Sequence, residues 1–290
     1  MAVSEKLQAG LKALRLSTML VEIERFQEDP AARNLNFDEK LEHLVTYELT
    51  TRETRAVANG IRAALFTEHY RLEDYDFERM PNLDKKLIVD LHSCDWISRG
   101  DNLILSGGHG LGKTHFAISI GLEACEKRYR VLFKKADQLV LKLLEAREEA
   151  RVLSLRTKLQ RVDLLIIDEL GYAPFDRQGG ELLHGVICDR YDARRSVVVT
   201  TNLEFGRWVE VFKSKKMTVA LLDRLTHRCD VIVMDGKSKR HEESVKRQQE
   251  RRSKKSRKEV VTKTWRERET HTRRPQWKGV STPAPRQRRP

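Results

Sequence analysis

The sequence predicts an α/β fold in which a parallel sheet is covered by helices on both faces. Between residues 100 and 235, short apolar runs alternate with segments of helical apolar spacing, and this alternation is typical of parallel sheets whose strands are joined by helices. Residues 1–75 carry helical patterns only, and residues 241–290 are basic and poor in core-forming residues. We therefore expect a small all-helical N-terminal domain (1–75), an α/β domain (76–240) and a basic, disordered tail (241–290).

The N-terminal domain is predicted from two stretches of helical apolar spacing, at residues 11–26 and 37–64. Asn36 or Asp38 is the expected cap of the second stretch, because their side-chain oxygens can accept hydrogen bonds from the first turn. The second stretch also carries arginines that either contact DNA or form a solvated helix face: Arg52, Arg55 and Arg62.

Five apolar runs have the length of strands. They cover residues 102–106, 130–134, 162–168, 196–201 and 230–234. Parallel sheets collect their ligands at the carboxyl ends of the strands, so the residues after each run are the candidates for a functional site.

The residues after the first strand form the pattern G-x-x-x-x-G-K-[ST], with Gly107, Gly112, Lys113 and Thr114 at the fixed positions. This pattern binds a nucleoside triphosphate, because its glycines let successive N–H groups face the phosphates and the next helix presents its positive end to them. The lysine reaches the β- and γ-phosphates, and the threonine holds Mg²⁺. The predicted nucleotide-binding residues are Gly107, Gly108, His109, Gly110, Leu111, Gly112, Lys113, Thr114 and His115.

Two carboxylates follow the third strand. Four buried-type residues, LLII, lead into Asp168 and Glu169. We expect Asp168 to bind Mg²⁺, largely through water because this ion keeps much of its hydration shell. We expect Glu169 to orient and deprotonate the water that attacks the γ-phosphorus.

Two further residues are candidates for the same reaction. Asn202 follows the fourth strand and can position the attacking water, provided that this strand lies beside the phosphate loop; a plain turn asparagine would look the same in the sequence. Arg224 precedes the last strand and can neutralise γ-phosphate charge in a neighbouring subunit. Arg228 competes for this role, and Arg224 alternatively pairs with Asp223 or Asp230.

The positive charge of the chain is concentrated in its tail. Residues 237–290 contain 20 Lys and Arg against 6 Asp and Glu, a net charge of +14, while the whole chain carries +13. Such a segment either binds nucleic acid by releasing counterions from phosphates or is a solvated extension. No run approaches the roughly 18 apolar residues of a membrane span, no apolar signal opens the chain, and four scattered cysteines lack zinc spacing. We expect a cytoplasmic protein that does not contact membranes.

On these residues the chain resembles the IstB-like ATP-binding proteins, the AAA+ helper ATPases of bacterial insertion sequences, which are related to helicase loaders. Segments that carry the resemblance include LILSGGHGLGKTHFAISIG, LLIIDELGYAPFD, VVVTTN and LLDRLTHRCDVIVMDGKSKR. The resemblance implies ATP and Mg²⁺ as cofactors and self-assembly into a ring or filament on double-stranded DNA. It also implies a transposase of the same element as partner. Gly108 and His109 stand where members of this family often have two prolines.

Two other functions remain open on the sequence. The same fold serves helicase loaders, which would grip a replicative helicase through the N-terminal domain. The protein could also be a DNA-binding scaffold in which ATP is a structural ligand and is not hydrolysed.

Overall fold

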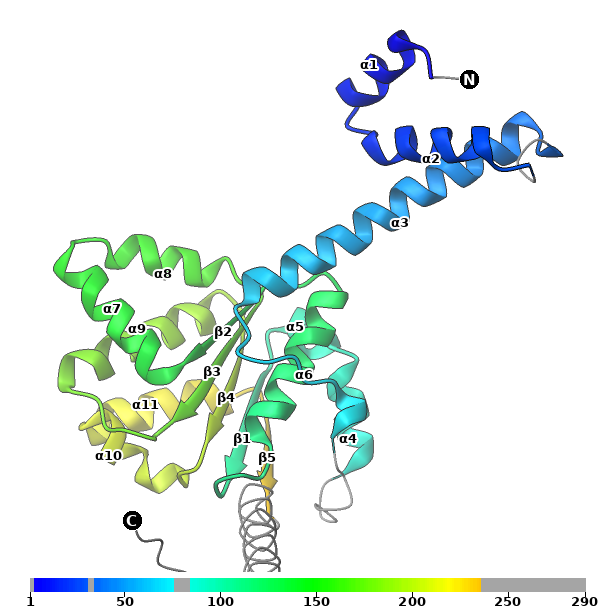
Figure 1. Ribbon diagram of the computed structural model, residues 1–290. Helices are drawn as coiled ribbons and strands as arrows, with labels where there is room; N and C mark the ends of the chain where they lie inside the picture. The colour runs from blue at the N-terminus through cyan, green and yellow to red at the C-terminus, as the bar shows by residue number, and fades with distance from the viewer. Residues whose placement is uncertain (1–2, 31–33, 76–83, 236–290) are drawn as a thin grey trace, which may run out of the picture. The chain divides into compact units, whose positions relative to one another are not determined.

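The computed structural model describes residues 3–30, 34–75 and 84–235 (Figure 1). The predicted basic tail therefore lies outside the described residues. Among those that are described, no helix is both long enough and apolar enough to cross a membrane. In chain order the elements are α1 (Glu5–Ala13), α2 (Ser17–Glu28), α3 (Phe37–Ala64), η2 (Leu72–Asp74), α4 (Lys85–His92), α5 (Asp95–Arg99), β1 (Asn102–Gly107), α6 (Lys113–Glu126), β2 (Val131–Lys135), α7 (Ala136–Glu148), α8 (Val152–Gln160), β3 (Leu164–Leu170), α9 (Arg177–Asp192), β4 (Ser196–Thr201), η4 (Phe205–Arg207), α10 (Trp208–Phe212), α11 (Lys215–Thr226) and β5 (Cys229–Met234).

The five strands form one parallel sheet in the order β2-β3-β4-β1-β5. All five predicted strands are confirmed to within a few residues. The order brings β4 between β1 and β3, with Ser106 paired to Thr201. The carboxyl ends of these three strands therefore meet at one edge of the sheet.

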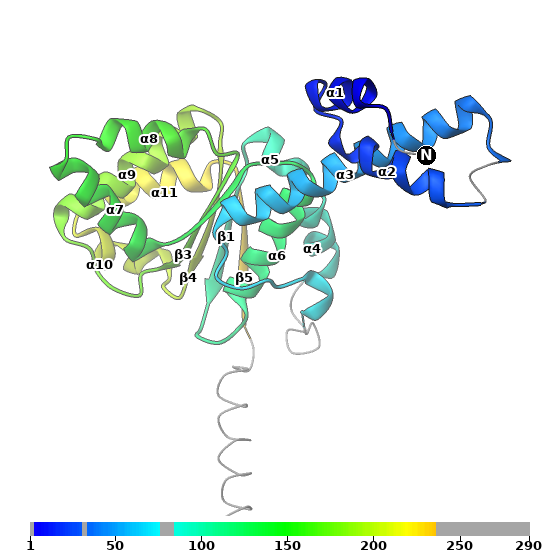
Figure 2. The ribbon, with the colours of Figure 1, turned by 45° about the horizontal axis from the view of Figure 1, so that its top comes forward.

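Helices cover both faces of the sheet, as predicted, and Figures 1 and 2 show α4 to α6 on one face and α7 to α11 on the other. Successive residues of a strand point to opposite faces, so one strand contributes to both cores. Ile166 belongs to the same core cluster as Phe116 of α6, whereas Ile167 belongs to the cluster that contains Leu183 of α9. Both sets of side chains are buried, which explains why the strands read as continuous apolar runs.

The N-terminal helices differ from the expected pair in one respect. The first stretch is broken after α1, because Arg15 adopts a left-handed φ of +57° and α2 begins at Ser17. The predicted cap of α3 is confirmed at Asn36, whose Oδ1 accepts from Glu39 N at 2.9 Å while Glu39 Oε2 accepts from Asn36 N at 2.8 Å. This reciprocal pair satisfies two N–H groups that the helix itself leaves without partners.

Arg52 is half-exposed, but its guanidinium forms two hydrogen bonds with other N-terminal residues. Its Nε donates to Glu48 Oε1 at 2.7 Å and its Nη2 donates to the carbonyl of Arg15 at 2.6 Å. Glu48 is buried and also accepts from Met19 N at 3.0 Å. Arg52 thus joins α3 to the turn between α1 and α2, and this role explains its position better than DNA contact does.

The end of α3 packs into the core beside α6. Ala64 is fully buried there, and Ile61 and Phe66 lie against the same cluster. Tyr75, which follows η2, is also part of this core. The boundary near residue 75 stays a prediction, although apolar packing continues across it.

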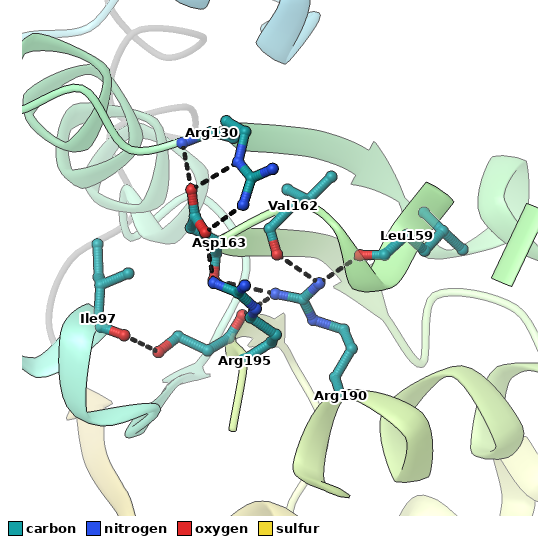
Figure 3. A network of polar contacts seen from close by, with 8 residues as sticks. Ile97, Arg130, Leu159, Val162, Asp163, Arg190 and Arg195 are labelled. Atoms are coloured by element: carbon teal, nitrogen blue, oxygen red, sulfur yellow. Dashed lines mark hydrogen bonds and ion pairs between the residues drawn. The ribbon is translucent and has the colours of Figure 1, made fainter. Parts of the chain in front are cut away.

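A buried arginine holds the amino-terminal edge of the sheet (Figure 3). Arg190 of α9 is fully buried and donates four hydrogen bonds to backbone carbonyls: Leu159 and Ser196 at 2.6 Å, and Val162 and Asp163 at 3.1 Å. Burial lowers the pKa of Arg190. The carbonyls belong to α8, to the loop before β3 and to the start of β4, so this one guanidinium fixes three segments relative to one another.

Replacing Arg190 by Met keeps most of the volume and removes all four donors. The free energy of unfolding should fall by about 2–4 kcal/mol, because buried carbonyls that lose a partner cost about 1–3 kcal/mol each and some relax toward water. Urea denaturation followed by circular dichroism measures this change. Arg207→Met is the control, since Arg207 forms only an exposed pair with Glu210; equal midpoints for the two variants would contradict the role of Arg190.

Candidate nucleotide-binding and hydrolysis site

The phosphate loop joins the end of β1 to the start of α6 and depends on left-handed glycines. Gly107, Gly110 and Gly112 have φ values of +151°, +75° and +85°, which side chains with a Cβ rarely adopt. A Cβ on Gly107 would lie 2.1 Å from the carbonyl oxygen of Met234. The glycines of the sequence motif are therefore required by the backbone and by the close approach of β5.

Lys113 is the first residue of α6, and its ammonium lies against the loop. Its Nζ donates to the carbonyls of Gly107 at 2.9 Å and Gly108 at 2.6 Å. The first N–H groups of a helix have no partners within the helix and carry partial positive charge. The loop, the helix end and the lysine therefore bring positive charge and N–H groups together, which is the arrangement that the motif predicts for holding an anion.

Asp168 and Thr114 meet where β3 faces α6. Thr114 Oγ1 donates to Asp168 at 2.9 Å, and Thr200 Oγ1 of β4 donates to the same carboxylate at 2.6 Å. Asp168 is fully buried, and burial is the main reason that its pKa is raised. A nearby cation would stabilise the ionised form of a carboxylate in this environment.

The donor set fits Mg²⁺ better than a transition metal. Oxygen ligands from one carboxylate and one hydroxyl suit Mg²⁺ bound together with water and substrate phosphates. In the described part of the chain, no group of three or more His, Cys, Asp or Glu side chains could form a closed metal site. The residues of this chain therefore fit an ion that is shared with a nucleotide.

Glu169 is held in a strained backbone conformation next to Asp168. Its φ is +59°, in the left-handed region, and the pairing of β3 with β4 shifts register between Ile167 and Leu170. Glu169 N donates to Thr200 Oγ1 at 2.9 Å. A bulge of this kind re-aims one side chain of a strand, and such strain persists only where the surroundings impose it.

The carboxylate of Glu169 forms an ion pair with Lys135, the last residue of β2. Lys135 Nζ donates to Glu169 Oε2 at 2.7 Å. This hydrogen bond is the main reason that the pKa of Lys135 is raised. One oxygen of the predicted base is thus occupied by a cation from the neighbouring strand.

Asn202 lies beside the phosphate loop because β4 is the neighbour of β1. Its Nδ2 lies 2.9 Å from Nε2 of His109 in the loop. The sheet order therefore meets the condition on which its predicted role depended.

Two aromatic residues before β1 contact the loop and the start of α6. Tyr75 OH donates to the carbonyl of Leu111 at 3.1 Å, and a Cβ on Gly112 would lie 3.0 Å from its ring. The ring of His115 stacks on Tyr70 at a centroid distance of 4.4 Å. His115 is therefore held by aromatic packing against the segment that connects α3 to η2.

Arg224 does not lie with these residues in the single chain. It is on α11, across the sheet from α6 (Figure 1), and its Nη1 donates to the carbonyl of Ala220 in its own helix at 3.0 Å. Within the described chain it forms no ion pair with Asp223 or Asp230. Arg228 is exposed. A role for either arginine would require a second subunit.

Three residues of this site were not predicted from the sequence. Thr200, Lys135 and Tyr75 contact Asp168, Glu169 and the phosphate loop respectively. Thr200 and Lys135 lie at the carboxyl ends of predicted strands, so the rule that located Asn202 could have found them. No pattern in the sequence around Tyr75 predicts its contact with the phosphate loop.

Known proteins resemble the chain over most of its length. The family model described as IstB-like ATP binding protein matches residues 9–247. The putative ATP-binding protein of insertion sequence IS232 from Bacillus thuringiensis subsp. berliner is 34% identical over 236 residues, which cover 81% of this chain and 94% of the relative. The corresponding protein of insertion sequence IS21 from Pseudomonas aeruginosa is 32% identical over 241 residues, 83% of this chain and 91% of the relative.

The fold also resembles that of solved structures. A replication initiator DnaA bound to AMPPCP and single-stranded DNA matches with a TM-score of 0.51 and 17% identity, over 60% of this chain and 52% of that chain. The likeness concerns the fold alone, a parallel sheet with helices on both faces. The family match over residues 9–247 shows that this chain belongs to the IstB-like ATP-binding proteins of insertion sequences.

Proposed function

We propose that the protein is a Mg²⁺-dependent and DNA-dependent ATPase that assembles on double-stranded DNA and assists a partner transposase in target selection and insertion. The observation that carries the catalytic part is the contact of Thr114 with Asp168, beside Glu169 and next to β4, the strand that Asn202 follows. These groups are what phosphoryl transfer to water needs, in which catalysis is mainly positioning and charge stabilisation.

Each residue has a separate role in this reaction. Mg²⁺, when bound at Thr114 and Asp168, would neutralise charge on the phosphates. Lys113 leaves the loop carbonyls and binds the β- and γ-phosphates. Glu169 accepts a proton from the attacking water, and Asn202 orients that water from the other side.

The partner is inferred from the relatives. Proteins that share about a third of their residues with this chain carry names of insertion-sequence ATP-binding proteins, and an insertion sequence moves through its transposase. Assembly of several copies would bring Arg224 to the γ-phosphate of a neighbouring subunit, with Arg228 as the alternative. The position of Arg224 away from its own site supports action between subunits.

The basic tail is the proposed electrostatic contact with DNA. Residues 237–290 carry a net charge of +14, and neutralising phosphates with such a segment releases condensed counterions.

Replacing Glu169 by Gln should reduce ATP turnover by about 10²- to 10⁴-fold, the usual contribution of a positioned general base, while ATP binding survives. Turnover is measured by phosphate release and binding by calorimetry with Mg²⁺. Glu181→Gln, at an exposed carboxylate of α9, is the control and should keep normal turnover. Wild-type protein that binds ATP with DNA but releases no phosphate would instead favour the scaffold function.

Replacing Lys135 by Met should raise ATP turnover without DNA by up to about fivefold. The ion pair with Lys135 occupies one carboxylate oxygen of Glu169, and a partly exposed pair of this kind is worth about 0–1 kcal/mol. Lys134→Met, at the preceding position on the opposite face of β2, is the matched control. A fall in turnover with unchanged ATP affinity would show that Lys135 positions the base rather than restraining it.

Truncation after Gly236 should weaken binding to duplex DNA by about tenfold or more and flatten the dependence of the affinity on salt. Fluorescence anisotropy at several salt concentrations gives both quantities. A tail of the same composition in shuffled order should restore them, because the contact is electrostatic. Equal affinity and slope for the truncated and full chains would make the tail a solvated extension.

A further inference from the structure

His109 is an exposed residue of the phosphate loop, and its side chain contacts Asn202, the residue that follows β4. It stands between Gly108 and Gly110, and its Nε2 lies 2.9 Å from Asn202 Nδ2. The contact is possible because β1 and β4 are paired up to Ser106 and Thr201, so that the residues following the two strands are neighbours.

With Nδ2 facing the ring, this contact determines which hydrogen-bonding groups of the Asn202 amide remain available. An asparagine amide has two N–H donors and one carbonyl acceptor. When Nδ2 donates to His109, Nε2 accepts and carries no proton, which is the tautomer with its proton on Nδ1. Asn202 then keeps one N–H, which can donate to a γ-phosphate oxygen, and Oδ1, which can accept from a water.

The ring of His109 is not needed for the shape of the loop. That shape depends on the left-handed glycines and on Leu111, which is buried and whose carbonyl accepts from Tyr75. Removing the imidazole should therefore change the orientation of Asn202 more than it changes the phosphate cradle.

We propose that His109 is a positioning residue for ATP hydrolysis, which acts by holding the Asn202 amide with its carbonyl oxygen available to the attacking water. Its effect on turnover rests on the proposed ATPase function, whereas the hydrogen bond itself does not. The two can fail separately, and the experiment has one arm for each.

The kinetic arm separates positioning from binding. His109→Ala should lower kcat by about three- to tenfold, the value of one hydrogen bond, and should leave the affinity for ATP within about twofold. His109→Gln, which keeps an acceptor, should recover part of the loss. In an Asn202→Ala background, His109→Ala should have no further effect, because the two residues act as one unit. The same loss in both backgrounds, or a loss of ATP affinity alone, would overturn the proposal.

The spectroscopic arm does not require hydrolysis. In full-length protein labelled with ¹⁵N-histidine, long-range proton–nitrogen spectra report which ring nitrogen carries the proton, and His109→Ala identifies the signals. Neutral His109 should be protonated at Nδ1 in the wild type and should shift toward Nε2 protonation in Asn202→Ala. Protonation at Nε2 in the wild type would overturn the proposal. If wild-type protein releases no phosphate, the ATPase function fails, and the kinetic role of His109 fails with it. The spectra still show whether Asn202 donates a hydrogen bond to His109.

Discussion

The site depends on one buried carboxylate that ties three elements together. Asp168 accepts hydrogen bonds from Thr114 at the start of α6 and from Thr200 on β4, and it lies on β3 itself. These bonds fix the helix that follows the phosphate loop against two central strands. Because the carboxylate is buried and its pKa is raised, its ionised form would be stabilised most by a cation bound between it and the phosphates of a nucleotide.

The same bonds explain how Glu169 is placed. Thr200 donates to Asp168 and accepts from the N–H of Glu169, so one hydroxyl supports both acidic residues. In a regular strand, adjacent side chains would point to opposite faces of the sheet, and only one carboxylate would face α6. The bulge and the φ of +59° at Glu169 remove this restriction. In the proposed reaction, this strained residue would allow two consecutive acids to serve one site.

Sequence reasoning found the residues whose chemistry is encoded locally. The glycine pattern predicts the loop between Gly107 and Lys113, and an apolar run followed by two acids predicts Asp168 and Glu169. The contacts of Thr200, Lys135 and His109 depend on which strands are neighbours, and alternation along the chain predicts a parallel sheet without giving its order. The break after α1 was missed because the apolar spacing continues through Arg15. The contacts of Arg52 were not predicted, because one of them reaches the carbonyl of Arg15, which is far away in the sequence.

The single chain holds the groups for binding a nucleotide more completely than the groups for hydrolysing it. Lys113, Thr114 and Asp168 lie close together in one chain, whereas Glu169 is paired with Lys135 and Arg224 belongs to α11, which lies on the opposite face of the sheet from α6. A site of this kind can retain ATP until another event frees the base and supplies a second cation. Assembly on DNA would provide both if a neighbouring subunit contributed Arg224 and if contact near the end of β2 displaced Lys135. Hydrolysis would then follow assembly. The protein would hold ATP before assembly and ADP after it.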